Sequence, residues 1–284
     1  ADWTSLNRSL MEGNITYDID ELYQINYAYP AVALISWGFF TFLFLKASPS
    51  WSKKLFPAYD SLSDNLKQDW NSRVTSLVHC AIVSPIAIYV VLADEEVNRD
   101  PVWGHSVISR IVMAITEGFM LADFLVVIKY FPLKDAIIFS LHHLATLYPY
   151  TYNVLYGPMP YFGCFKLTTE GSTPFVNLRW FLSTLELTDG DLYFYNGILM
   201  TFSFFVLRIL TIIPYWISVY RTFSTHPMPG ITPHMRNSLI FGSIALDLLN
   251  IYWFRKMLLG AKKVMDKRNL ANEKEAKTIK DKEL

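Results

Sequence analysis

Two adjacent histidines, His142 and His143, are the side chains of this 284-residue chain best suited to chemistry. A neutral imidazole beside a carboxylate can act as a nucleophile or as a general base. Consecutive residues point about 100° apart on a helix, so one histidine at a time would face a given cavity. The same pair could instead join helices through hydrogen bonds, as polar residues do in membrane bundles. Both interpretations stay open at this point.

Depth along the predicted helices brings acidic residues to the level of the histidine pair. At about 1.5 Å of rise per residue, His143 lies roughly 10 Å into its span and Glu170 roughly 15 Å into the next, antiparallel span. Glu117 and Asp247 fall near the same level. Because an ionisable group facing lipid is costly, we predict one buried polar centre in which His143 and Glu170 face each other. For Asp247 with Asn250, joining helices is the favoured role.

Further polar residues in or near the spans are candidate ligand contacts. Arg208 is deep and should pair with a carboxylate, whereas His79 would either line the cytosolic mouth or simply be packed. No His-Glu-x-x-His motif and no Gly-rich phosphate loop occur, so we expect neither a metal nor a nucleotide cofactor. The catalytic candidates are His143, His142 and Glu170. The ligand-binding candidates are His79, Glu117, Asp123, Thr173, Asn177, Arg208 and Asp247.

Composition shows that these residues sit in membrane helices. Hydrophobic residues make up 52% of the chain and charged residues only 18%, which is more apolar than a water-soluble surface of this size tolerates. We therefore predict an all-α, multi-pass membrane protein of about seven helices, and nucleic acid is not an expected partner. The apolar runs long enough to span a bilayer are 25–45, 74–92, 107–127, 136–155, 160–181, 192–215 and 239–259.

Lysine and arginine positions predict the orientation. The loop between the first two runs and the tail after the last run are rich in both, so they should be cytosolic. The N-terminus is then lumenal, where Asn7 and Asn14 begin two glycosylation sequons. The predicted division is a lumenal segment (1–24), a first membrane helix (25–45), a six-helix domain (60–261) and a cytosolic basic tail (262–284).

Several segments resemble the TLC-domain family, which includes ceramide synthases and translocating-chain-associated membrane proteins. The similarity runs from about the second predicted span to the seventh. The segments that carry it are Trp70–Val74 (WNSRV), Asp100–Gly104 (DPVWG), the pair His142-His143, Glu170 with Ser172–Phe181 (STPFVNLRWF), and Asn196–Met200 (NGILM).

The resemblance implies a ring of six membrane helices around a long lipid cavity, usually in the endoplasmic reticulum. Ceramide synthases use a histidine of the paired-His helix to transfer an acyl group from acyl-CoA to a sphingoid amine, helped by a His-Asp pair and a further Asp on the next helix. Here Thr169-Glu170 stands in place of His-Asp, and Thr173 in place of the further Asp. The ceramide-synthase motif is therefore incomplete.

Three functions fit the sequence. The preferred hypothesis is a lipid-handling protein that binds a membrane lipid or fatty acyl chain and contributes to lipid homeostasis. The second is an acyltransferase with acyl-CoA as a substrate, and the third is a non-catalytic scaffold or assembly subunit. A homodimer or a membrane complex is compatible with all three. We also predict that the first span, 25–45, packs outside the ring, because it holds no buried charge.

Overall fold

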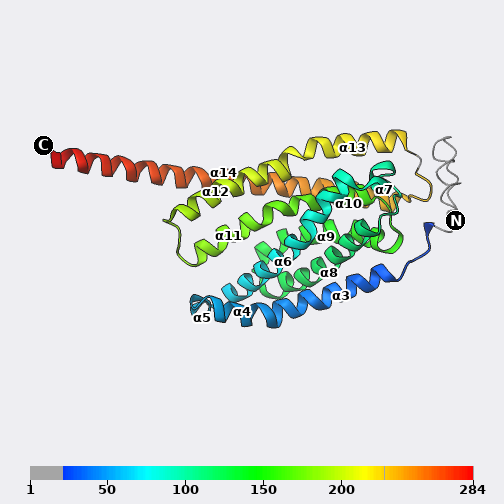
Figure 1. The fold of residues 1–284 in the computed structure, drawn as a ribbon, viewed down its shortest axis with the longest axis horizontal. Coiled ribbons are helices and arrows are strands. Elements are labelled where there is room, and N and C mark those ends of the chain that lie inside the picture. Colours follow the sequence, from blue (N-terminus) through cyan, green and yellow to red (C-terminus); the bar gives the residue numbers. More distant parts are fainter. Residues whose placement is uncertain (1–21, 227, 284) are drawn as a thin grey trace.

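The structure is a computed structural model that describes residues 22–226 and 228–283, with side chains described up to Asp266. The sequons at Asn7 and Asn14 lie outside the described residues. Within them the chain is all-α, as predicted, and the helices form seven long rods packed side by side (Figure 1). Short helices α5 (Ala58–Ser61) and α7 (Glu95–Arg99) lie in two of the connections.

The rods include both straight and interrupted helices. Three are single α-helices: α6 (Asp64–Ala93), α8 (Val107–Tyr130) and α9 (Leu133–Tyr156). The first rod joins α3 (Ala28–Phe42), the π-helix η1 (Leu43–Ala47) and α4 (Ser48–Leu55). The fifth rod joins α10 (Pro160–Leu167), the 3-10 helix η2 (Thr168–Ser172) and α11 (Thr173–Thr184). The sixth rod joins α12 (Asp191–Phe204), the π-helix η3 (Phe205–Leu210) and α13 (Ile212–Thr225). The last rod is α14 (Pro233–Glu283), which continues as a helix well beyond the bundle (Figure 1).

Four of the rods are long and apolar enough to cross a membrane by themselves: 28–55, 64–93, 107–130 and 191–225. The other three rods carry the histidine pair, Lys166, Glu170 and Asp247, and these polar residues lower their hydropathy. The protein is therefore a membrane protein in which the more polar helices pack against the apolar ones. The first rod reaches Leu55, ten residues past the end predicted for it.

Small residues bring two pairs of helices into close contact. A Cβ atom on Gly118 of α8 would lie 2.3 Å from the Ala33 carbonyl oxygen of α3, and one on Gly242 of α14 would lie 2.5 Å from the Ala145 carbonyl oxygen of α9. The hydroxyl of Ser36 also donates to the Ile115 carbonyl across the α3–α8 contact, at 2.7 Å. Close backbone approach at glycine is a common basis of helix association in membranes.

Loops close the end of the bundle that carries α7, on the right in Figure 1. The Met159 amide donates to the Val102 carbonyl at 2.6 Å, and the Trp103 indole donates to the Pro229 carbonyl at 2.9 Å. Val102 and Trp103 are buried in one cluster with Leu22. Three connections that are far apart in sequence thus form one packed cap, at the end that the charge pattern predicts to be lumenal.

Candidate functional site: an intramembrane cavity with two polar pairs

The bundle contains a cavity of about 360 Å³. Its wall comes from α6, α8, α9, the η2–α11 rod, the α12–η3 segment and α14, so all six later rods contribute. None of its lining residues belongs to the first rod, as expected for a helix outside the ring. Of the ten predicted site residues, seven line this cavity: Asp123, His142, His143, Glu170, Thr173, Asn177 and Arg208.

His143 is held by two contacts. Its Nε2 lies 3.0 Å from Oδ2 of Asp123, and its Nδ1 lies 2.6 Å from the Phe139 carbonyl oxygen. Asp123 is itself held by Ser72, whose hydroxyl donates to Oδ1 at 2.8 Å. A carbonyl and a carboxylate both accept hydrogen bonds, so both ring nitrogens of His143 are engaged and neither offers a free lone pair.

This arrangement corrects the predicted partner of His143. The expected contact with Glu170 is replaced by the contact with Asp123, although Glu170 lines the same cavity. Depth along the helices was estimated from the rise per residue, but depth does not say which neighbouring helix turns its acid toward the ring. Helix α8 supplies that acid, one helix before the histidines.

Arg208 and Glu170 form the second polar pair. The guanidinium Nη2 lies 3.5 Å from Oε1 of Glu170 and donates to the Thr173 hydroxyl at 3.0 Å. Its Nε donates to the Ser172 hydroxyl at 2.8 Å, and its Nη1 donates to the side-chain oxygen of Asn250 at 3.2 Å. Arg208 thus has the carboxylate neighbour expected from its depth.

Irregular helical turns position both members of that pair. Glu170 lies in the 3-10 helix η2, and Arg208 lies in the π-helix η3. A π-turn inserts one extra residue per turn and so rotates the following side chains relative to an unbroken α-helix, and such turns recur at functional sites. Here it accompanies a buried guanidinium in the middle of an apolar segment.

His142 differs from His143 in having no hydrogen-bonding partner on its ring among the described residues, and its Nδ1 is buried. The ring packs edge-on against His143 and near Trp253, with centroids 5.6 Å away in each case. The two neighbouring imidazoles therefore differ: the His143 ring is held in a polar network, and the His142 ring has no hydrogen bond within the described residues.

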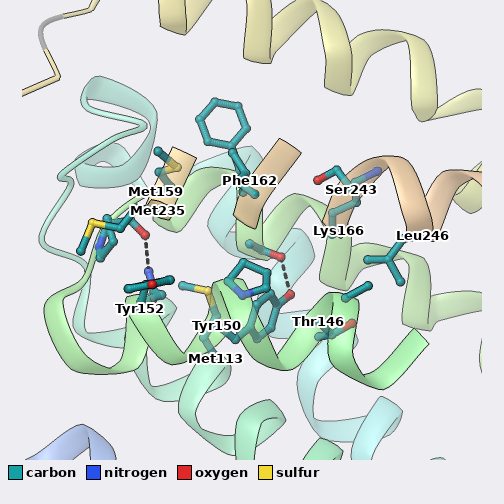
Figure 2. A pocket seen from close by; sticks show the side chains of 16 residues that line it. Met113, Thr146, Tyr150, Tyr152, Met159, Phe162, Lys166, Met235, Ser243 and Leu246 are labelled. Carbon is teal, nitrogen blue, oxygen red and sulfur yellow. Dashed lines mark hydrogen bonds between the residues drawn. The ribbon is translucent and has the colours of Figure 1, made fainter. Parts of the chain in front are cut away.

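Two smaller cavities lie between His142 and the closed end of the bundle. A chamber of about 30 Å³ is lined by His142, Glu170 and Arg208 together with Tyr150 and Lys166. Tyr150 and Lys166 also line a pocket of about 30 Å³ nearer the closed end, where methionine side chains converge and the Tyr150 hydroxyl donates to the Gly163 carbonyl at 2.7 Å (Figure 2). The polar centre is thus followed by a mainly apolar region rather than by bulk solvent.

Two predicted ligand contacts, His79 and Glu117, lie outside the cavity. His79 is fully buried, stacked on Phe119 at 3.9 Å between ring centroids, and is a packed core residue and not part of a mouth. Glu117 accepts a hydrogen bond from Thr151 of α9 at 2.6 Å. Glu117 and Asp123 are six positions apart, which places them about 120° apart around α8, so only one of them can face the histidines.

Asp247, the third predicted ligand contact outside the cavity, joins three helices. Its Oδ1 lies 2.6 Å from Nζ of Lys166, and its Oδ2 accepts from the Trp216 indole at 2.8 Å. The pair joins α10 and α14 to α13 and does not line the main cavity. This position fits the helix-joining role favoured from the sequence rather than a ligand contact in the main cavity.

Three charged lining residues near the other end of the cavity were missed: Asp69, Arg73 and Lys256. Nε of Arg73 lies 2.9 Å from Asp69, and its guanidinium lies 4.5 Å from the centre of the Trp180 ring. An acid and a base four residues apart, just before the second span, were the available signal. They place charge at the end of the cavity that is predicted to be cytosolic.

The fold and the site define a multi-pass α-helical membrane protein with a polar cavity inside its helix ring. Residues 69–259 match the TLC domain, and the chain belongs to the TLC-domain family. It is 37% identical to TLC domain-containing protein 4-B of Xenopus laevis over 82% of this chain and 90% of that protein. It is 34% identical to TLC domain-containing protein 4 of Homo sapiens, over 83% of this chain and 90% of that protein.

A more distant relative is the Topoisomerase I damage affected protein 4 of Saccharomyces cerevisiae, 26% identical over 81% of this chain and 84% of that protein. No solved structure matches the chain.

Proposed function

We propose that this protein handles a membrane lipid by holding its acyl chain in the 360 Å³ cavity, with the polar end near the two buried pairs, and so contributes to lipid homeostasis. The observation that carries the proposal is the composition of the wall. Apolar side chains such as Met120, Val127 and Phe204 surround a centre of ionisable groups inside a membrane-embedded ring. Ligand sites combine an apolar wall with a few placed polar groups in this way, and the volume falls in their usual range.

The charged end of the cavity adds a preference for the ligand. Arg73 and Lys256 can meet a phosphate or carboxylate at the end predicted to be cytosolic. Arg73 is partly neutralised by Asp69, while the Lys256 ammonium lies 4.6 Å from the centre of the Tyr252 ring. A lipid with an anionic end is therefore the proposed class.

The test is mass spectrometry of the lipids that stay with the purified protein. We expect one acyl class to be strongly enriched over the surrounding membrane, and Val176→Trp, which fills the cavity, to remove it. Ile128→Trp is the matched control, because Ile128 lies on the lipid-facing surface of α8. If the wild-type protein carries no enriched lipid, the proposal is wrong, and the result supports a non-catalytic scaffold or assembly subunit instead.

Acyl transfer is the second candidate, and the free ring of His142 is what favours it. Nε2 of His142, in the tautomer with the proton on Nδ1, would attack the thioester carbonyl of an acyl-CoA. The C–S bond would break, and the departing thiolate would take up the proton that the acyl-imidazolium loses from Nδ1. The acyl group on the imidazole would then pass to an acceptor amine or hydroxyl, which gives up its proton as the imidazole is restored. Nε2 is the proposed nucleophile because Nδ1 is buried.

Intact-protein mass spectrometry after incubation with a long-chain acyl-CoA tests this candidate. An added acyl mass that hydroxylamine removes is expected for the wild type and for His79→Ala, but not for His142→Ala. His143→Ala should slow the reaction without abolishing it, because that ring is engaged by Asp123. Labelling that survives the loss of both cavity histidines would exclude the mechanism.

We propose that the protein resides in the endoplasmic reticulum, the usual location expected from its resemblance to the TLC-domain family. Fluorescence microscopy of a tagged chain against markers of that organelle is the test.

A further inference from the structure

A second lipid-accessible space lies outside the helix ring, between the first rod and α8. It measures about 140 Å³ and is lined by residues of the α3–η1 segment, by Thr75 and by one face of α8. Its lining includes Leu45 and Leu125, each about half exposed, so the space opens toward the surrounding lipid. The central cavity takes none of its wall from the first rod, so the two sites are separate in that respect.

One end of this lateral pocket is apolar and the other is cationic. Phe40 and Ala122 form the buried part. Lys129 and Tyr130 lie at the other end, in the last turn of α8, with the ammonium 4.9 Å from the centre of the Tyr130 ring. Lysine beside an aromatic ring at the end of a membrane helix is typical of the level of lipid headgroups.

Charge at this end is not neutralised within the described part of the chain. No acidic side chain there forms an ion pair with Lys129, and Asp123, which also lines the pocket, has its two oxygens bound by Ser72 and His143. Basic residues beside a membrane attract anionic lipids, and the first rod adds Lys46 at the same end. The site is therefore complementary to a negative headgroup.

We propose that the lateral pocket binds an anionic phospholipid of the leaflet at this end of the bundle, with one acyl chain against Phe40 and Ala122 and the phosphate on Lys129. Phe119 and Asp123 line both this pocket and the central cavity, so the bound chain touches their common wall. The Phe119 ring contacts Phe40 edge to face, with centroids 5.0 Å apart, and stacks on His79 at 3.9 Å. This proposal does not depend on what the central cavity binds.

The experiment uses the full-length protein in lipid nanodiscs that contain a photoreactive phosphatidylserine or, in parallel, a phosphatidylcholine carrying the same reactive acyl chain. Cross-linked peptides are mapped by mass spectrometry. We expect the phosphatidylserine probe to label the 37–45 and 122–130 segments more strongly than the phosphatidylcholine probe. Lys129→Gln should lower that labelling about fivefold, and Lys129→Arg should keep it.

Ala122→Phe supplies a second, steric test, because Ala122 lines the lateral pocket and not the central cavity. It should abolish labelling of these segments, whereas Val176→Trp, which acts on the central cavity alone, should leave it intact. Equal labelling by both probes, or phosphatidylserine labelling unchanged in Lys129→Gln, would show ordinary boundary lipid and overturn the proposal. Because the charge variants leave the core untouched, they decide the question even if Ala122→Phe does not fold.

Discussion

The closed end of the bundle and the cavity use polar residues in different ways. At the closed end the acidic and hydroxyl side chains between α6 and α8 mainly bond to nearby backbone: Asp94 caps α7, Ser106 caps α8, and Asp100 accepts from two amides within three residues. The Trp103 indole, which donates to the Pro229 carbonyl, makes a long-range contact there. In the cavity the partners are distant, as in His143 with Asp123 and Arg208 with Glu170. Local bonds shape a turn, whereas distant ones hold helices at a set spacing and leave polar groups facing a space.

The largest expected effect comes from breaking a cavity pair. Arg208→Met leaves Glu170 buried without its cation, which should cost about 3–5 kcal/mol of unfolding free energy. Thermal unfolding of the detergent-purified protein measures it. The double variant Arg208→Met with Glu170→Gln should recover part of the loss, because no unpaired charge remains. If the single variant is as stable as the wild type, the pair does not hold the helices.

A smaller loss is expected when Asp123 is changed to Asn. The substitution keeps the shape but removes the charge from a hydrogen bond, which is worth about 1.5–3 kcal/mol. The released His143 ring should also become more reactive, so its ethoxycarbonylation by diethylpyrocarbonate, mapped by mass spectrometry, should rise toward that of His142. Unchanged protection of His143 would show that Asp123 does not restrain it.

At the closed end, Trp103→Phe should cost about 1 kcal/mol, the net value of one hydrogen bond. The indole donor to Pro229 is lost, while most of the buried ring remains. The content of bound lipid should not change, since Trp103 does not line the central cavity. Loss of bound lipid at near-normal stability would show that the closed end influences the central cavity and that the two regions are not independent.

The smallest effect is expected for Glu117→Gln. Glu117 contacts Thr151 and does not line the cavity, so the lipids that copurify with the protein should match those of the wild type. Glu170→Gln is the contrasting variant and should alter them. If Glu117→Gln changes the bound lipid and Glu170→Gln does not, Glu117 contributes to the lipid site although it does not line the cavity.

The sequence could predict the helices and the depth of a residue along each helix, but it could not predict the direction in which a side chain points. Seven apolar runs predicted the rods, and seven of the ten candidate site residues do line the cavity. Glu117 and Asp123 show the limit of depth alone, because both lie on α8 but point about 120° apart around it, and only Asp123 lines the cavity. The pairing of His143 with Asp123 was missed for the same reason, since no spacing rule links residues on two packed helices.

The sequence by itself determined a polytopic helical membrane protein with ionisable residues at mid-depth, because apolar length and the cost of charge in lipid act along the chain. Tertiary structure alone decided which histidine is engaged and which is free. That choice depends on how α8 and α9 are rotated against each other and on the π-turn at Arg208, and both depend on packing between helices. Contacts of that kind are set by three-dimensional neighbours, which a linear pattern does not contain.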